Sequence, residues 1–517
     1  MATADGYVVD VDYIPGFYPQ MAPVSLRHVA ALNGLVPPAT GEGFRYLELG
    51  CGLGRSLTTL AAAYPGGRFV GVDVNPRHTT AIEADLAAGD LDNVRVITAD
   101  FGSLPDDLGQ FDFIAMHGVW SWVSPRVRQD ILAVAENRLA PGGLFLVSYN
   151  AMPGWAHLQP IKGILQQYAS LRTGDSIQRV RDALAYLVFI RDKKAKYFED
   201  NPRAAAYVDA LLKQDISYLA HEYLNEHWTS FYFAEVAAAF RGAGLRFAGS
   251  LPVYTNFWDL CVKPEFQELF RTTTDRLVTE AHKDFCANTA FRWDLYAKAP
   301  RPLASAADRL REVDDLHYSL ARPDLSLPYQ ANLGVVTSTV QGPLYQAFID
   351  ALRGGGRRLS ELVATASDGS RKPEELIRAL DAGVAMGMFE VTAADVPAPP
   401  AEQPERVAVT LPFNLAMLRA GSLGGRPVAL ASRRTGSGVQ LGDLEAAMLL
   451  ELAESGREGL AARVDARLIA SGRSIQKDNK PVTDEVARLA IIEQAAAGFL
   501  GSRLSQLLAT GVVEPGA

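Results

Sequence analysis

Short apolar runs alternate with helical stretches between Phe44 and Ser148. The apolar runs are FRYLEL, RFVGVD, VRVITAD, FDFIAMHG and LFLVSYN. Each run is nearly continuous in apolar residues, which is typical of strands that helices cover on both faces. The alternation therefore predicts a parallel α/β sheet, and we expect a turn at Pro141-Gly142-Gly143 to separate the last helix from its strand.

The pattern becomes purely helical from Ala156 to about Asn225, which predicts a helical insertion over residues 156–226. A helix over 232–244 then ends in glycine and is followed by the strand candidate LRFAGS, and a last strand, FRWDLYAKA, is expected at 291–299. The sheet thus resumes after the insertion, so residues 1–155 and 227–299 are expected to form one core.

The last two regions are set apart by proline-rich stretches. Residues 300–395 contain three short helical runs followed by MFEV, which is the order of a winged-helix-like module. Residues 396–517 begin with a proline-rich and acidic linker and continue as a mixed α/β accessory domain without a recognisable catalytic motif.

Composition narrows the class of protein. The chain has 517 residues, of which 48% are hydrophobic and 21% charged, so it is expected to fold into three or four globular domains. Its net charge of -9 disfavours nucleic acid as a partner. No window approaches about 18 consecutive apolar residues, so we expect no membrane span.

Localisation and metal content follow from the same composition. The first twenty residues lack the basic and apolar regions of a secretory signal, and three cysteines neither pair evenly nor match a zinc spacing. His221 and His227 are six positions apart, whereas zinc-binding histidines on one helical face are four apart. We therefore expect a cytoplasmic protein without a metal site.

The stretch E-L-G-C-G-L-G, residues 48–54, lies where the first strand ends and a helix begins. Its glycines allow a tight turn and the close approach of a nucleotide-like ligand to the backbone. Asp73 ends the next strand, where its carboxylate can accept hydrogen bonds from ribose hydroxyls, and Asp100 ends the third strand, where it can receive an adenine amino group. The predicted cofactor site comprises Glu48, Gly50, Cys51, Gly52, Gly54, Asp73, Val74, Asp100, Phe101 and His117.

This motif, with both acids in register, resembles the class I S-adenosylmethionine-dependent methyltransferases. Segments such as HGVWSWVSP, SYNAMPGW and HEYLNEHWTSFYFAEV further resemble bacterial members that carry a methyltransferase regulatory domain. These include protein-lysine methyltransferases that modify outer-membrane proteins, and the resemblance spans roughly residues 7–299. It implies a Rossmann-like methyltransferase sheet, S-adenosyl-L-methionine as the cofactor, and a protein acceptor or a small-molecule substrate.

Aromatic residues and one histidine follow the fourth and fifth strands, where the transferred methyl group is expected. Trp120, Trp122 and Tyr149 are predicted to desolvate and orient an acceptor amine, because aromatic faces attract ammonium and sulfonium groups. His117, Tyr13 or water is expected to accept the acceptor's proton. The acidic arm around Tyr13 resembles the family's entry segment, which is expected to fold over the cofactor as a lid.

Two further functions remain open. One is the O- or N-methylation of a small molecule, lipid or glycan, for which His117 would be a required base. The other is a regulatory or binding protein that only senses the cofactor. The insertion 156–226 is predicted to contact the acceptor or a second copy of the chain, which makes a homodimer possible.

Overall fold

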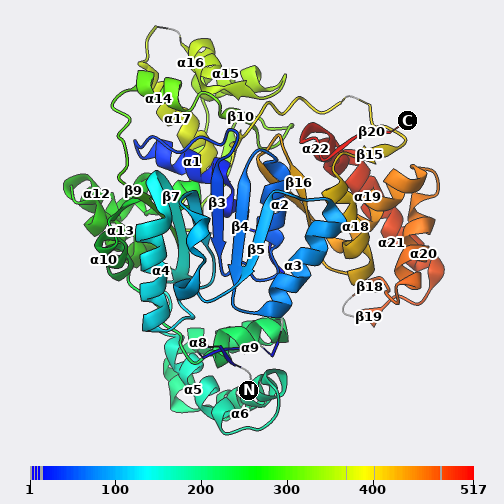
Figure 1. Cartoon of the computed structure of the whole chain (residues 1–517). Coiled ribbons are helices and arrows are strands. Elements are labelled where there is room, and N and C mark those ends of the chain that lie inside the picture. The colour runs from blue at the N-terminus through cyan, green and yellow to red at the C-terminus, as the bar shows by residue number, and fades with distance from the viewer. Residues whose placement is uncertain are drawn as a thin grey trace.

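A seven-stranded sheet forms the centre of the computed structural model, which describes residues 3–4, 6–8, 10–11, 15–367, 369–400, 402–477 and 480–516 (Figure 1). The strand order is β5-β4-β3-β6-β7-β9-β8, and β9 alone runs antiparallel to both of its neighbours. The bounds are β3 Arg45–Leu49, β4 Arg68–Asp73, β5 Val94–Thr98, β6 Phe111–Met116, β7 Leu139–Asn150, β8 Leu245–Leu251 and β9 Phe291–Lys298. The predicted α/β sheet and its resumption after the insertion are both confirmed.

The predicted turn at Pro141-Gly142-Gly143 is wrong as a boundary of the fifth strand. Strand β7 already begins at Leu139, which pairs with Phe111. The register then shifts, so that Leu144 pairs with Phe113, and the intervening residues form a bulge. The turn residues therefore lie inside the strand.

Helices cover both faces of the sheet, and neighbouring strand residues point to opposite faces. Tyr46 belongs to a cluster with α1 (Pro23–Leu32), α2 (Arg55–Ala63) and α3 (Pro76–Gly89), whereas Leu47 packs with α4 and α10. Helix α4 spans Pro125–Arg138, and α10 spans Phe233–Gly242. The segment between β8 and β9 adds α11 Trp258–Cys261, α12 Gln267–Thr272 and α13 Arg276–Ala287.

The insertion is a five-helix bundle at one end of the sheet, below it in Figure 1, with a hydrophobic cluster of its own. Its helices are α5 Gln159–Ser170, α6 Ser176–Asp192, α7 Lys196–Asp200, α8 Pro202–Leu211 and α9 Ile216–Leu224. The N-terminal hairpin, β1 Thr3–Ala4 and β2 Tyr7–Val8, is fastened to it: the Val8 N–H donates to Asn225 Oδ1 over 2.9 Å, and the Glu226 N–H donates to the Gly6 carbonyl.

The middle module, residues 306–392, lies at the opposite end of the molecule (Figure 1). The three predicted helices and the final strand are present, and a second hairpin precedes them. The bounds are α14 Ala306–Glu312, β10 His317–Leu320, β11 Tyr329–Asn332, β12 Thr337–Val340, α15 Pro343–Leu352, β13 Arg357–Arg358, α16 Leu359–Ala366, α17 Pro373–Ala385 and β14 Phe389–Thr392. Strands β13, β10 and β14 form one antiparallel sheet, and the winged-helix assignment stays a prediction.

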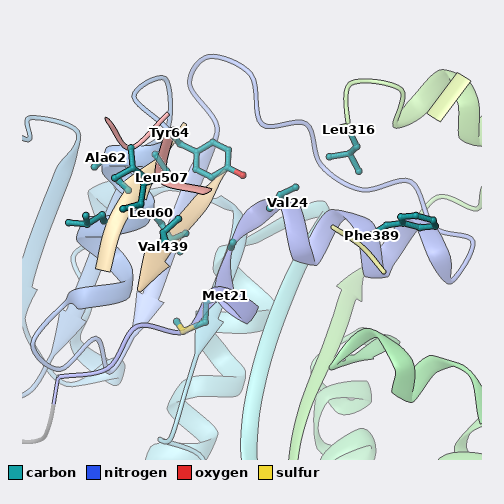
Figure 2. Packing of buried hydrophobic residues seen from close by; sticks show 14 of the residues in the cluster. Met21, Val24, Leu60, Ala62, Tyr64, Leu316, Phe389, Val439 and Leu507 are labelled. Carbon is teal, nitrogen blue, oxygen red and sulfur yellow. The ribbon is translucent and has the colours of Figure 1, made fainter. Parts of the chain in front are cut away.

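The C-terminal module, residues 407–516, packs on helices α2 and α3 of the core. Its elements are β15 Val407–Val409, α18 Pro412–Gly424, β16 Val428–Ser432, β17 Ser437–Leu441, α19 Asp443–Ser455, α20 Leu460–Ala470, β18 Gln476–Lys477, β19 Lys480–Pro481, α21 Glu485–Gly498, a π-helical turn at Phe499–Arg503, α22 Leu504–Ala509 and β20 Val513–Pro515. Val439 and Leu507 lie beside Leu60 and Tyr64 of the core in a shared hydrophobic cluster (Figure 2). Among the described residues, no helix has the length and apolarity needed to cross a membrane.

A buried ion pair within the middle module is linked to the core by a histidine of helix α1. The Arg309 guanidinium donates two hydrogen bonds of 2.7 Å to the Asp381 carboxylate, and His28 Nε2 of helix α1 lies 3.0 Å from Asp381 Oδ1. Burial alone would raise the pKa of Asp381, but Arg309 and His28 outweigh burial and lower it. The carboxylate is therefore stabilised in its ionised form.

Replacing this carboxylate should destabilise the protein. Asp381→Asn leaves the Arg309 charge buried and uncompensated, which costs about 3–5 kcal/mol in the free energy of unfolding measured with urea at pH 7. Because the native pKa is lowered, the carboxylate's contribution is present above the unfolded value of about 3.9 and is lost as pH falls through the native value. The exposed acid Asp350, paired with Arg353 on the same module, is the control: Asp350→Asn should change stability by less than about 0.5 kcal/mol. Equal effects of the two variants would contradict the assignment.

Candidate active site

A cleft opens at the carboxyl ends of β3, β4, β5 and β6, where an open parallel sheet ordinarily binds its ligand. All ten residues of the predicted cofactor site line it: Glu48, Gly50, Cys51, Gly52, Gly54, Asp73, Val74, Asp100, Phe101 and His117. Further lining comes from Tyr7, Pro15, Gly16 and Tyr18, so the N-terminal arm covers part of the cleft.

The glycine loop between β3 and α2 presents backbone to the cleft. Gly52 has φ +53°, and a Cβ added there would meet no atom within 4 Å, so a side chain at this position would project into open space. Gly54 has φ +68°, and its Cβ would lie 2.6 Å from Ile82 of α3, so close helix packing requires glycine at that position. The loop therefore leaves room for a ligand on one side and packs tightly on the other.

Asp73, at the end of β4, fixes this loop. Its Oδ2 accepts a hydrogen bond from the Gly52 N–H over 2.8 Å, and its Oδ1 accepts one from the Asn75 N–H over 2.9 Å. His78 Nδ1 lies 3.1 Å from the same Oδ1. Two carboxylate oxygens offer about four acceptor positions, so one position is left for a ligand in the cleft.

Glu48 carries a buried oxygen that lacks a protein partner. The side chain is 5% exposed, and its Oε2 makes no hydrogen bond in the described part of the chain. Burial, together with the nearby charge of Asp73, raises the pKa of Glu48 to about 8. A buried carboxyl group of this kind is stabilised by a ligand that brings a hydrogen-bond donor or a positive charge.

Arg55, the first residue of α2, is the sole lysine or arginine among the described residues that line the cleft. Its Nη1 donates to Asp85 Oδ2 over 2.8 Å, and the Arg55 side chain remains 31% exposed. The cleft thus has a cation at the helix N-terminus, where the backbone N–H groups also favour an anion. Asp100 and Phe101, after β5, line another part of the same cleft.

His117 is enclosed by aromatic rings. Its ring stacks on Trp293 with centroids 4.2 Å apart, and the ring centroid of Tyr18 lies 3.8 Å away on another side. The Ser148 hydroxyl accepts a hydrogen bond from the Gly118 N–H and lies 2.8 Å from His117 Nδ1, to which it can donate. Burial lowers the pKa of His117 to about 3, so the ring is neutral at physiological pH.

A second cavity adjoins the first across this stack. It is lined by Trp293, Phe291 and Tyr254, by the buried acids Asp284 and Asp294, and by the turn Leu333–Val335 of the middle module. Because His117 lines the cleft and Trp293 lines the second cavity, the two stacked rings form the partition between them.

The structure does not bring Trp120 or Tyr149 to the cleft, which corrects their expected contact with the acceptor. Trp120 is 3% exposed and packs on Phe240 of helix α10. The Tyr149 hydroxyl donates to Asp294 Oδ2 over 2.5 Å within a buried ionic cluster. Tyr13 lies outside the described residues.

Three residues of the site were missed from the sequence. No motif pointed to Tyr18 or Trp293, because each gains its role from neighbours that are distant in the chain. No motif pointed to Arg55, because its role depends on its place at the start of a helix. Trp293 does lie in the predicted strand FRWDLYAKA, but the strand pattern assigned it no functional role. No group of three or more potential metal ligands occurs in the described ranges.

Comparisons with known proteins identify the family. A "Methyltransferase domain" profile matches residues 47–143, and a "Predicted methyltransferase regulatory domain" profile matches residues 215–298. An uncharacterized protein of Synechocystis is 30% identical over 513 residues, covering 99% of this chain and 100% of that protein; one of Rickettsia prowazekii is 31% identical over 281 residues, covering 53% and 49%. The structure of PKMT2 from Rickettsia typhi in complex with AdoHcy shares the fold, with a TM-score of 0.69, 21% identity, and coverage of 98% of this chain and 100% of that one.

The resemblance noted from the motif residues is thereby confirmed for fold, cofactor and reaction class. The glycine loop and Asp73 lie within the matched methyltransferase domain, and β8, α13 and β9 lie within the matched regulatory domain. The chain belongs to the S-adenosylmethionine-dependent methyltransferases that combine a class I methyltransferase domain with a methyltransferase regulatory domain.

Proposed function

We propose that this methyltransferase N-methylates lysine side chains of a protein acceptor, and that the cleft holds its cofactor. The observation that carries the proposal is the partition of neutral, stacked rings, His117 and Trp293, between the cleft and a second cavity. Such faces attract the sulfonium on one side and an ammonium or methylated amine on the other. PKMT2 of Rickettsia typhi, a protein lysine methyltransferase by name, has the same fold, which supports this acceptor class.

The charges of the cleft match the amino-acid end of the cofactor. Glu48 offers a buried, unpartnered acceptor for the ammonium group, and Arg55 at the start of α2 offers a cation for the carboxylate. Asp73 retains one acceptor position for a ribose hydroxyl, and Asp100 with Phe101 takes the adenine end. Gly52 lets the ligand approach the backbone closely.

The acceptor reaches the methyl group from the second cavity in this proposal. A lysine amine has a reference pKa near 10.4, so the site must favour its neutral form, and desolvation against Phe291 and Trp293 does so. S-adenosylmethionine supplies an electrophilic methyl group; the protein's part is to align the amine nitrogen with that carbon and exclude water. The proton lost from nitrogen goes to water.

Methylation of a hydroxyl is the second candidate, and the state of His117 argues against it. A hydroxyl acceptor needs a general base whose pKa lies near the working pH. Burial lowers the pKa of His117 to about 3, which makes the ring a weak base at pH 7. An amine acceptor needs no such base, because its neutral nitrogen carries the attacking lone pair.

A transfer assay tests the acceptor class. After incubation of cell protein with the enzyme and isotopically labelled S-adenosylmethionine, mass spectrometry should locate the label on lysine side chains. Label on serine or threonine oxygens, on lipid, or on glycan would replace the amine proposal with O-methylation. Omission of the enzyme is the control.

Glu48 should couple cofactor binding to proton release. Because its pKa is raised to about 8, Glu48 is mostly protonated at pH 7, and a bound ammonium group favours its ionised form. Binding of S-adenosylhomocysteine at pH 7 should therefore release up to about one proton, and affinity should rise between pH 6 and pH 8. Calorimetry in buffers of different ionisation enthalpy measures this release. Glu48→Gln should abolish it; equal proton release in both proteins would remove Glu48 from the ammonium site.

Asp73→Ala should weaken binding of S-adenosylhomocysteine by about 1.5–3 kcal/mol, because it removes charge-assisted hydrogen bonds to the ribose and to the Gly52 loop. Asp73→Asn, which keeps one carbonyl acceptor, should lose less. Asp92→Ala, at an exposed acid of the same domain, is the matched control and should bind as the wild type does. A folded Asp73→Ala protein with unchanged affinity in calorimetry would exclude this residue from the cofactor site.

Phe291→Leu should lower turnover on the protein acceptor about tenfold while leaving the affinity for S-adenosylhomocysteine unchanged, because Phe291 lines the acceptor cavity and not the cofactor cleft. The control is Phe285→Leu, at a neighbouring aromatic residue that is 65% exposed and lines neither cavity. If the acceptor binds elsewhere, Phe291→Leu should have the same turnover on the protein acceptor as Phe285→Leu.

A further inference from the structure

A short strap, residues 15–18, runs between the cofactor cleft and the C-terminal module. Pro15, Gly16 and Tyr18 line the cleft, whereas Phe17 is 8% exposed and does not line it. Two consecutive residues of the strap therefore lie in different environments: Tyr18 lines the cleft, whereas the Phe17 side chain is buried behind it.

The C-terminal module holds Phe17. A Cβ added at Gly438 of β17 would lie 2.8 Å from Phe17 Cζ and 2.6 Å from Thr59 Cγ2 of α2. The Phe17 ring therefore lies against the backbone of the β16–β17 hairpin at Gly438, where the absence of a side chain leaves room for it. This hairpin also packs along α2, as Val439 beside Leu60 shows (Figure 2).

Tyr18 depends on this anchor for its place in the cleft. Its N–H donates to Ser56 Oγ in the first turn of α2 over 3.0 Å, and its ring lies 3.8 Å from that of His117. Burial and the nearby Glu48 raise the pKa of Tyr18, so its hydroxyl stays protonated. The strap is thus fixed to the hairpin at Phe17 and to the cleft at Tyr18.

A second contact links the module to the cleft. The Arg55 guanidinium lies 2.9 Å from the Met417 sulfur of α18, a residue that is 4% exposed. The same helix packs on α3, where a Cβ at Gly89 would lie 2.9 Å from the Phe413 ring. Helices α2 and α3, which carry the cofactor loop and follow Asp73, are therefore enclosed between the sheet and the C-terminal module.

We propose that the C-terminal module is a positioning element of the cofactor cleft, with Phe17 as the positioning residue that holds Tyr18 against His117. A strap held in place before binding needs no ordering when the cofactor arrives, and such preorganisation raises affinity. The module therefore supports the chemistry itself and does not serve the acceptor alone. This inference rests on the proposed placement of the cofactor in the cleft.

The test compares S-adenosylhomocysteine binding by full-length variants in calorimetry. Phe17→Ala and Gly438→Ala should each raise Kd about tenfold, because both release the strap. Phe17→Leu, which keeps an apolar anchor, should restore most of the affinity. Gln440→Ala changes an exposed residue of the same hairpin and should bind as the wild type does.

The results of this test distinguish a role of the module in cofactor binding from a role in acceptor docking. Gly438→Ala keeps the Phe17 ring, so it tests the contact even if Phe17→Ala fails to fold. The inference is overturned if folded Phe17→Ala or Gly438→Ala protein binds S-adenosylhomocysteine with the wild-type Kd. It is also overturned if these variants change only the KM for the protein acceptor, because that result would assign the module to acceptor docking. If Asp73→Ala also binds S-adenosylhomocysteine as the wild type does, the proposed position of the cofactor in the cleft is itself wrong. If Asp73→Ala weakens binding but the strap variants do not, the cofactor position is supported and the strap's role is refuted.

Discussion

The hydrogen bond from the Gly52 N–H to the Asp73 carboxylate is the constraint on which the cofactor side of the molecule depends. It joins the loop after β3 to the end of β4, so two strand ends and the start of α2 become one rigid unit. The positive φ of Gly52 turns its N–H toward that carboxylate while leaving the outer side of the loop open. Glu48 becomes buried behind the same loop, which raises its pKa and prepares a site for a positively charged ligand.

The C-terminal module changes how this unit is stabilised. In an isolated three-layer α/β domain, the outer faces of α2 and α3 would be exposed to solvent. Here Leu60 of α2 and Tyr64, which follows that helix, share a hydrophobic cluster with Val439 and Leu507, so α2 is buried on two sides (Figure 2). Core and module therefore share one hydrophobic core, although the middle module and a proline-rich linker separate them in sequence.

The sheet could be predicted from the sequence because its strands carry continuous apolar runs, and the cofactor residues could be predicted because they follow strand ends at fixed spacing. Of the residues predicted to contact the acceptor, Tyr149 lies away from the cleft for a reason of parity. Strand β7 continues to Asn150, so Ser148 and Tyr149 point to opposite faces of the sheet; Ser148 reaches His117, and Tyr149 reaches Asp294. Tyr18 and Trp293 were not predictable, because antiparallel β9 brings Trp293 to His117 from 176 positions away.

The buried cluster that contains Tyr149 sets the electrostatics of the second cavity. Arg292 donates to Asp284, Glu280 and Asp294, and Lys283 pairs with Glu280, so three carboxylates surround two cations. Burial raises the pKa of Asp284 to about 6, so above that pH its carboxylate is mostly ionised. Buried charges cost desolvation free energy that ion pairing only partly returns. Arg292 and Lys283 line the second cavity together with Asp284 and Asp294, so opposite charges balance there, and the apolar rings of Phe291 and Trp293 supply the desolvation that would favour the neutral form of the proposed lysine acceptor.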